Sequence, residues 1–179
     1  QANYLENYYN DITSLIERNE FMSPSSYLLI RNISKVFENI NYSRYSIEKW
    51  YNIISEKKRV RIVQLHNNLS NEHFLKNKKS YFISWNKSKR DMPIYDLLNI
   101  FNKFYYEIDF CDLLGIYEKN YQLLPEEKYL LFSLISLPNK LMLSGSEYQK
   151  CLSVKKFYDK LYAAFVVISE YMPKEKISK

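Results

Sequence analysis

The chain has 179 residues, 46% of them hydrophobic and 17% aromatic, which is enough apolar material to bury a core. Two glycines, five prolines and two cysteines (Cys111 and Cys151) exclude a low-complexity chain and a disulfide-stabilised scaffold, and the longest apolar runs, such as "LYAAFVVI", are too short to cross a membrane. The net charge of +6 favours acidic or phosphate-rich partners without specifying one. We therefore expect a soluble, globular, intracellular protein.

Helical periodicity dominates the first 55 residues. Apolar side chains recur every three or four positions over residues 4–18, which predicts a helix. After "MSPSS", Ser23 is a candidate N-cap with Pro24 in the first helical position, and an apolar stripe then continues to Ile40. A separate, shorter helix is predicted over residues 46–55.

The pattern changes to that of short strands at Arg59. The segments "RVRIVQL" (59–65) and "SYFISW" (80–85) alternate between polar or charged and apolar residues before becoming largely apolar, which is typical of strands. They enclose "HNNLSNEH" (66–73) and the polar turn "KNKK" (76–79). We therefore predict a small β-hairpin unit that carries a polar loop, a common position for functional side chains.

Helices are again predicted from residue 97 to the end of the chain. Apolar periodicity covers residues 97–108 and 110–121, and a further helix begins at Pro125 and ends at Pro138. Glu126 and Glu127 lie in its first turn, where the helix dipole favours acidic residues. The last helix contains Phe157, Leu161, Phe165 and Ile168 and is expected to fray in "MPKEKISK". Without a repeat or linker, residues 1–179 are predicted to form one mainly α domain.

The polar residues of "VQLHNNLSNEHFLKNKKSYFISWNKSKRDMPIYDL" (63–97) are spaced like the functional residues of a known catalytic segment. The segment resembles the catalytic region of the aminoglycoside phosphotransferase and choline kinase group, and most closely the spore-coat kinase-like family of spore-forming bacteria. That group has a His, any residue and a catalytic Asp, followed five positions later by a metal-binding Asn and then by a strand ending in Asp and an aromatic residue. The corresponding residues here, without a gap, are His66, Asn68, His73, Ser84 and Trp85.

The resemblance continues downstream of this segment. "DMPIYDL" (91–97) matches the place where these families have a Pro, an aromatic residue or His, and an Asp-Leu pair, and the matching Asp96 is the residue that braces the catalytic loop in the family. "LPEEKYLLFSLISLPNKLML" (124–143) resembles the late helix pair of the spore-coat group. The likeness implies a kinase-like C-terminal lobe. The family's Gly-rich N-terminal lobe is expected to be absent or to precede Gln1.

The departures from the family pattern remove the groups that carry out the reaction. Phosphoryl transfer requires a carboxylate at the attacking hydroxyl and an Asn and a carboxylate on the metal ions. Asn68 cannot accept a proton as a carboxylate does, Ser84 brings no charge, and the imidazole of His73 is a poor ligand for magnesium. The resemblance therefore implies a pseudokinase, not an enzyme, with no cofactor or metal. Because no Cys or acidic residue lies at ligand spacing from His66 and His73, His66 is expected to form hydrogen bonds within its own loop.

Other hypotheses remain open. An active small-molecule phosphotransferase would need Glu72, Asp91 or Asp96 to reach the metal. A nucleic-acid-binding module would use the basic clusters "EKKRVR", "KNKK" and "NKSKR", which would have to share a face. The pseudokinase hypothesis instead expects protein partners, with coat proteins as candidates, neither membrane nor nucleic acid, and a location in the cytoplasm or spore coat. The 18 tyrosines of the chain would suit packing in the dense protein layer of a spore coat.

Overall fold

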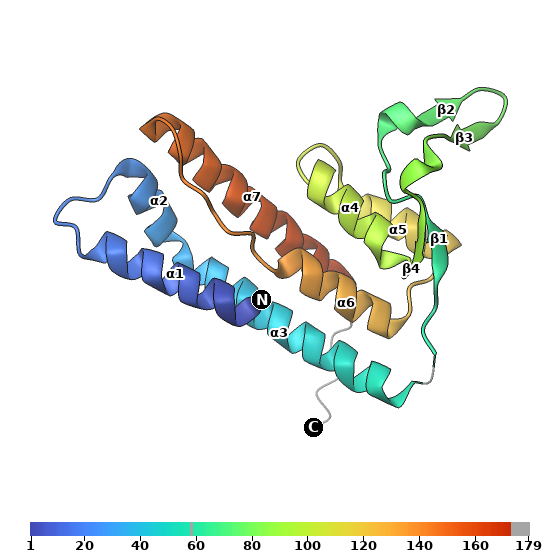
Figure 1. Ribbon diagram of the computed structural model, residues 1–179, viewed down its shortest axis with the longest axis horizontal. Helices are drawn as coiled ribbons and strands as arrows, with labels where there is room; N and C mark the ends of the chain where they lie inside the picture. Colours follow the sequence, from blue (N-terminus) through green and yellow to red (C-terminus); the bar gives the residue numbers. More distant parts are fainter. Residues whose placement is uncertain (58, 173–179) are drawn as a thin grey trace. The chain divides into compact units, whose positions relative to one another are not determined.

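The computed structural model describes residues 1–57 and 59–172, so most of "MPKEKISK" lies outside the described residues. The chain is mainly helical, with 66% helix and 7% strand (Figure 1). The helices are α1 (Ala2–Glu17), α2 (Pro24–Arg31), α3 (Ile33–Glu56), α4 (Ile94–Phe104), α5 (Phe110–Asn120), α6 (Pro125–Ser136) and α7 (Glu147–Tyr171). The strands are β1 (Val63–Leu65), β2 (Phe74–Lys76), β3 (Ser80–Phe82) and β4 (Lys89–Asp91).

The chain divides into two compact units. Unit 1 contains Gln1–Tyr45 and Ser136–Lys179, and unit 2 contains Ser46–Ile135. The expectation that residues 1–179 form one lobe stays a prediction. None of the helices in the described part combines the length and apolar character needed to span a bilayer.

Unit 1 is built around a core shared by α1, α2, α7 and the first part of α3. Its buried side chains are Leu5, Tyr9, Ile16, Leu29, Val36, Ile40, Leu141, Val154 and Leu161. Leu141, in the segment before α7, and Val154 of α7 do not belong to the apolar stripes predicted from the sequence. Three tyrosine hydroxyls add hydrogen bonds to main-chain carbonyls, from Tyr8 to Leu141 (2.6 Å), from Tyr9 to Asn139 (2.5 Å) and from Tyr158 to Leu29 (2.7 Å). The core therefore includes polar contacts between segments about 130 residues apart.

The predicted start of α2 is confirmed, but its predicted end is wrong. Ser23 caps the helix by accepting a hydrogen bond from the Ser26 N–H, and Pro24 occupies its first turn. The helix ends at Asn32, and α3 then runs unbroken to Glu56. The stripe of α3 continues through the small, buried Ser43 and Ser46. Because these two positions hold serine, the apolar periodicity in the sequence stops at Ile40, although the helix continues to Glu56.

The strands of unit 2 form two separate antiparallel pairs. β1 pairs with β4, with Gln64 opposite Arg90, and β2 pairs with β3, with Leu75 opposite Tyr81. The two predicted strands are therefore present in shortened form as β1 and β3, but they do not pair with each other. Their partners, "FLK" and "KRD", are too short and too charged to show a strand pattern. The loop at residues 66–73 leads from β1 into the β2–β3 hairpin.

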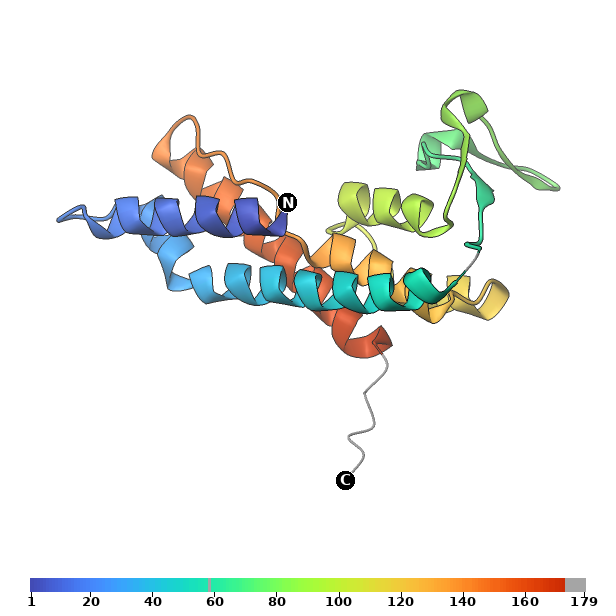
Figure 2. The same ribbon diagram turned by 60° about the horizontal axis from the view of Figure 1, so that its bottom comes forward.

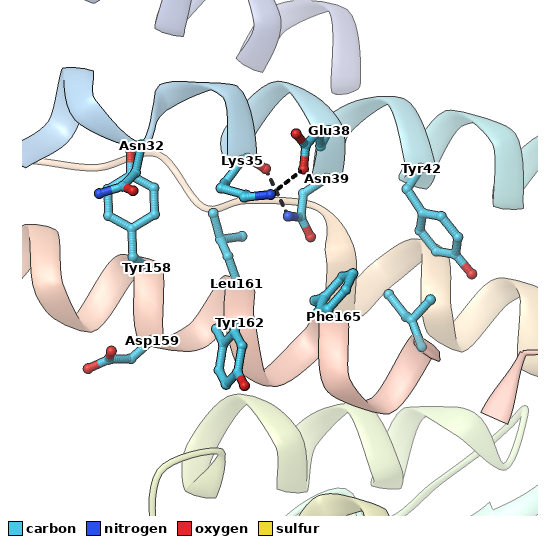
Figure 3. Close-up of a pocket in the computed structure, with 11 residues that line it drawn as sticks. Asn32, Lys35, Glu38, Asn39, Tyr42, Tyr158, Asp159, Leu161, Tyr162 and Phe165 are labelled. Atoms are coloured by element: carbon cyan, nitrogen blue, oxygen red, sulfur yellow. Dashed lines mark hydrogen bonds and ion pairs between the residues drawn. The ribbon is translucent and has the colours of Figure 1, made fainter. Parts of the chain in front are cut away.

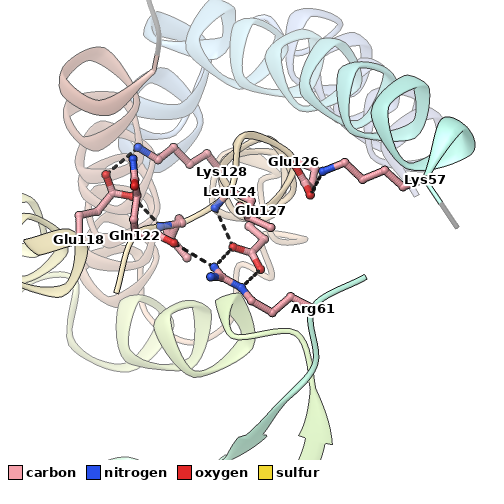
Figure 4. Close-up of polar contacts among 9 residues, drawn as sticks. Lys57, Arg61, Glu118, Gln122, Leu124, Glu126, Glu127 and Lys128 are labelled. Atoms are coloured by element: carbon pink, nitrogen blue, oxygen red, sulfur yellow. Dashed lines mark hydrogen bonds and ion pairs between the residues drawn. The ribbon is translucent and has the colours of Figure 1, made fainter. Parts of the chain in front are cut away.

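The segment before β1 is fixed to the first turn of α6 by two ion pairs (Figure 4). Glu127 is 2% exposed, and its two oxygens accept hydrogen bonds from the Arg61 guanidinium. One of these oxygens also accepts the Leu124 N–H at 2.8 Å, which satisfies a donor at the helix start. Lys57 pairs in the same way with the buried Glu126. The presence of these two glutamates in the first turn of α6 is therefore explained by their ion pairs as well as by the helix dipole.

Candidate functional site

The loop that follows β1 is held by the carboxylate of Asp96 in the first turn of α4. One oxygen accepts the main-chain N–H of His66 at 2.8 Å, and the other accepts that of Asn67 at 2.7 Å. Asn67 has a φ of 57°, in the left-handed region, where Asn is better tolerated than most residues. Hydrogen bonds to a charged acceptor are about twice as strong as neutral ones, so Asp96 fixes the entry into the loop.

The Asn67 side chain connects the loop to two further segments. Its amide nitrogen donates to the Lys87 carbonyl at 3.1 Å, and its amide oxygen accepts from Asn99 of α4 at the same distance. At the far side of the loop, Lys103 reaches the Leu69 carbonyl at 3.5 Å. The loop therefore rests on α4 through Asp96, Asn99 and Lys103.

His66 forms the buried centre of the loop. Its side chain is 3% exposed, and Nε2 donates to the Ile83 carbonyl at 2.7 Å. The ring packs against Trp85 with 4.7 Å between ring centroids and against Phe82 with 5.7 Å. Within residues 1–57 and 59–172, Nδ1 has no hydrogen-bond partner. The expectation that the His66 ring bonds within its own loop is therefore wrong, because it joins the loop to the end of β3.

The positions that match the family's reactive residues lie together around this histidine. The Nδ1–H of His73 donates to the Asn68 carbonyl at 2.7 Å, and the Asn68 side-chain nitrogen lies 3.4 Å from the same Nδ1. The Ile83 N–H donates to the His73 carbonyl at 2.9 Å, so Ser84 directly follows this pairing. Ser84 itself has a φ of 65° and makes no side-chain cap bond. Amide, imidazole and hydroxyl groups therefore stand at these positions.

The carboxylates near the loop either accept hydrogen bonds from the protein or are exposed to solvent. Both oxygens of Asp96 bind main-chain N–H groups. Asp91 accepts from Lys89 at 2.9 Å and from the Met92 N–H at 2.8 Å, and the Lys89 hydrogen bond lowers the pKa of its carboxyl. Glu72 is exposed in a short 3₁₀ turn, Asn71–His73. Among the described residues, no group of three or more His, Cys, Asp or Glu side chains could hold a metal ion.

A cavity of about 520 Å³ lies beside the loop within unit 2. Leu69 and Asp96 line its loop side, and its walls are mostly apolar residues from β1, α4 and α5, among them Leu97, Ile100 and Tyr117. Burial raises the pKa of the Tyr117 phenol to about 12, so this group stays protonated at neutral pH. The cavity could hold an apolar group, but it offers no cation for a phosphate.

A second cavity, of about 690 Å³, lies in unit 1 along α3 and α7 (Figure 3). Its lining includes Tyr42, Tyr158, Tyr162 and Phe165 together with the Lys35–Glu38 ion pair. Phe165 is 59% exposed, so the predicted apolar stripe of the last helix is partly wrong. The buried face of α7 is instead formed by Val154, Leu161, Ala164 and Val167. Of these four residues, only Leu161 belongs to the apolar set named from the sequence.

Comparison with known proteins places the chain in no family. No family model matches the sequence, no curated protein is significantly similar to it, and no solved structure matches it. The chemistry of the loop and its neighbours is therefore the basis for the functional proposal.

Proposed function

We propose that this chain is a catalytically inactive kinase-like (pseudokinase) lobe that acts by binding other proteins, with the spore coat as a candidate setting. The observation that carries the proposal is the Asp96 brace. The residue expected to hold a catalytic loop binds the main chain of His66 and Asn67, while the loop itself lacks a catalytic carboxylate. Such a site keeps its framework without its reactive groups.

The order of elements supports the same proposal. A short strand leads into the loop, a β-hairpin separates His73 from Ser84, and a return strand precedes the helix that bears Asp96. The resemblance implies strand, loop, strand and helix in this order, and β1, β3 and α4 agree with it, whereas β2 and β4 are additional. Asn68 and His73, five positions apart, contact each other across the loop as two residues of one site would.

The rival hypothesis of an active phosphotransferase needs a carboxylate that can reach a metal ion. Asp96 and Asp91 already have two hydrogen-bond partners each, and moving either of them would leave main-chain donors unsatisfied. Glu72 is exposed and would have to act alone. A single carboxylate gives magnesium few of the oxygen ligands that it requires.

Calorimetric titration with ATP, with and without magnesium, tests the proposal directly. We expect no magnesium-dependent binding for the wild-type chain or for the single variants Asn68→Asp and Ser84→Asp. The double variant Asn68→Asp/Ser84→Asp shows whether the two missing carboxylates create a metal site on this framework. Magnesium-dependent ATP binding by the wild-type chain would contradict the pseudokinase proposal and favour the active enzyme.

Exposed aromatic side chains support a role in protein binding. Eight of the 18 tyrosines are exposed, including Tyr106, Tyr148 and Tyr162, each at 68% or more. Tyrosine combines a large apolar ring with a hydroxyl that can form hydrogen bonds, which makes it frequent at interfaces. These residues are consistent with packing against partners in a dense protein layer.

A further inference from the structure

The positive charge of the chain is concentrated in one short segment. Residues 74–90, from the start of β2 into β4, contain six basic side chains and no acidic one: Lys76, Lys78, Lys79, Lys87, Lys89 and Arg90. The net charge of the entire chain is also +6. All other residues together are therefore formally neutral, and residues 74–90, here called the basic hairpin segment, carry the whole excess.

The same segment exposes large apolar side chains. The exposed fractions of Phe74, Leu75, Tyr81, Phe82, Ile83 and Trp85 lie between 39% and 56%. Contiguous exposed apolar side chains of this kind mark surfaces that bind another molecule. A two-stranded hairpin is also only marginally stable by itself, so a bound partner would stabilise it.

The hairpin places rings on both of its faces. Phe74 and Phe82 are directly opposite each other in the register, with 5.1 Å between ring centroids, whereas Leu75 and Tyr81 form the next pair and point to the other face. Trp85 is held at the base by a hydrogen bond from its indole to the Phe82 carbonyl at 2.8 Å. Figures 1 and 2 both show the hairpin extending away from α4 and α5.

The basic side chains lie at both ends of this aromatic stretch. Lys76, Lys78 and Lys79 lie at or beside the turn, which includes the Asn77 N–H to Lys79 carbonyl bond, and the other three lie at the base, in and before β4. An extended polyanion lying along the hairpin would meet cations at each end and rings in between. Two of the three basic clusters seen in the sequence thus lie in this one segment, in which Lys89 is paired with Asp91 at 2.9 Å.

We propose that the basic hairpin segment binds single-stranded nucleic acid, with phosphates on the lysines and bases stacked on the exposed rings. Proteins that bind single strands without sequence preference combine these two features. Protein interfaces are depleted in Lys, which provides five of the six cations here. A membrane surface would reach one face of the hairpin and would meet a polar turn first. This activity goes beyond the pseudokinase proposal, which expects protein partners and no nucleic acid.

Fluorescence anisotropy with a labelled oligothymidylate of about 15 nucleotides provides the first test. We expect the purified chain to bind at low salt, and the logarithm of the binding constant to fall linearly with the logarithm of salt concentration, by about 0.7 per phosphate contacted. Quenching of Trp85 fluorescence on binding would report stacking. Absence of binding at low salt would overturn the proposal.

Matched variants test whether binding depends on the hairpin or only on the net charge of the protein. Lys76→Gln/Lys78→Gln/Lys79→Gln should weaken binding about tenfold or more and reduce the salt dependence. Tyr81→Ala should weaken it about tenfold through lost stacking. The controls remove equal charge or an equally exposed ring elsewhere: Arg18→Gln/Lys119→Gln/Lys155→Gln and Tyr51→Ala. Equal losses in the controls would show that the hairpin is not the binding surface.

Two other polyanions decide which partner the surface prefers. Polyglutamate carries charge without bases, and vesicles containing phosphatidylserine carry charge on a membrane. Weaker binding to both than to the oligonucleotide, at the same salt concentration, supports the proposal. If polyglutamate binds as tightly, stacking contributes nothing and the proposal is wrong. If the vesicles bind more tightly and quench Trp85, the hairpin is a membrane-binding surface.

Discussion

Asp96 determines the conformation of the candidate loop through two main-chain hydrogen bonds. The neighbouring N–H groups of His66 and Asn67 converge on one carboxylate, and Asn67 itself adopts a left-handed backbone conformation. Two converging donors suit a carboxylate, which accepts on both oxygens, better than any neutral side chain of the same size.

Replacing Asp96 by Asn should therefore be destabilising. An amide has one acceptor oxygen, so one main-chain N–H would face the NH₂ group of the new side chain. We expect a loss of about 2 kcal/mol in the free energy of unfolding, measured by urea denaturation. Amide hydrogen exchange at His66 and Asn67 should accelerate more than elsewhere.

The control for this experiment is Asp112→Asn. Asp112 is an exposed acid in the first turn of α5, so it shares the helix-dipole environment of Asp96 but not the loop contacts. Its substitution should cost less than 1 kcal/mol, the range for an exposed charge at a helix terminus. Equal effects of the two substitutions would show that Asp96 acts through the dipole rather than by holding the loop.

Contacts between residues could be predicted from the sequence only where the residues lie a few positions apart in one motif. The spacing of His66, Asn68 and His73 predicted a common loop because all three lie within eight residues. By contrast, the pairing of Arg61 with Glu127 joins residues 66 positions apart. Any basic residue in the chain would have satisfied the same local pattern around Glu127. Contacts of this kind depend on the fold and cannot be derived from local periodicity.

At the scale of elements, helix starts were easier to predict than helix ends. Ser23 with Pro24 and Pro125 each provide a chemical signal that a helix begins. The break at Asn32 has only a weak signal, the Asn itself after Arg31, since neither Gly nor Pro follows it. The three-residue strands were difficult for another reason, because three positions are too few to establish an alternating pattern.

The helices α2 and α7 begin at a shared carboxylate. Glu147, the first residue of α7, accepts the Ser25 main-chain N–H of α2 at 2.7 Å. Hydrogen bonds from the Ser25 side chain and main chain are the main reasons that the pKa of Glu147 falls from its ordinary value of 4.5 to about 2. The charged carboxylate therefore satisfies a donor in the first turn of α2 while it lies in the first turn of its own helix.

The stability of unit 1 should depend on pH through this group. Because the pKa of Glu147 is lower in the folded state, its contribution is fully present above about pH 4.5 and is lost as pH falls toward about 2. Glu147→Gln should lower the melting temperature at pH 7, and the difference from the wild type should shrink through this acid range. Calorimetric melting curves at a series of pH values measure both effects.

The exposed Glu20 provides the comparison for Glu147. Glu20→Gln removes the same charge outside any helix, so its melting temperature should follow the wild type at every pH. A gap between the wild type and Glu147→Gln that stays constant down to pH 2 would argue against the hydrogen-bonded carboxylate as its cause.

At the scale of the whole molecule, buried tyrosines link stability to alkaline pH. Burial raises the pKa of both Tyr9 and Tyr158 above the ordinary value of 10, so their contribution is present below pH 10 and is lost as pH rises further. We expect tyrosinate absorbance to rise in two phases. Tyr9 and Tyr158 should ionise in the later phase, together with the loss of helical circular dichroism.

One substitution assigns the later phase. Tyr158→Phe should remove one tyrosinate from it. A single phase that includes all tyrosines, with the helical signal intact, would mean that Tyr9 and Tyr158 are accessible to hydroxide in the folded protein.

The concentration of charge in the basic hairpin segment has a consequence for the electrical behaviour of the molecule. The formal net charge of the chain at pH 7 equals that of this segment, so the other residues sum to zero. A negatively charged surface would therefore attract the hairpin more strongly than the remainder of the chain, and the protein should adsorb to it through this segment.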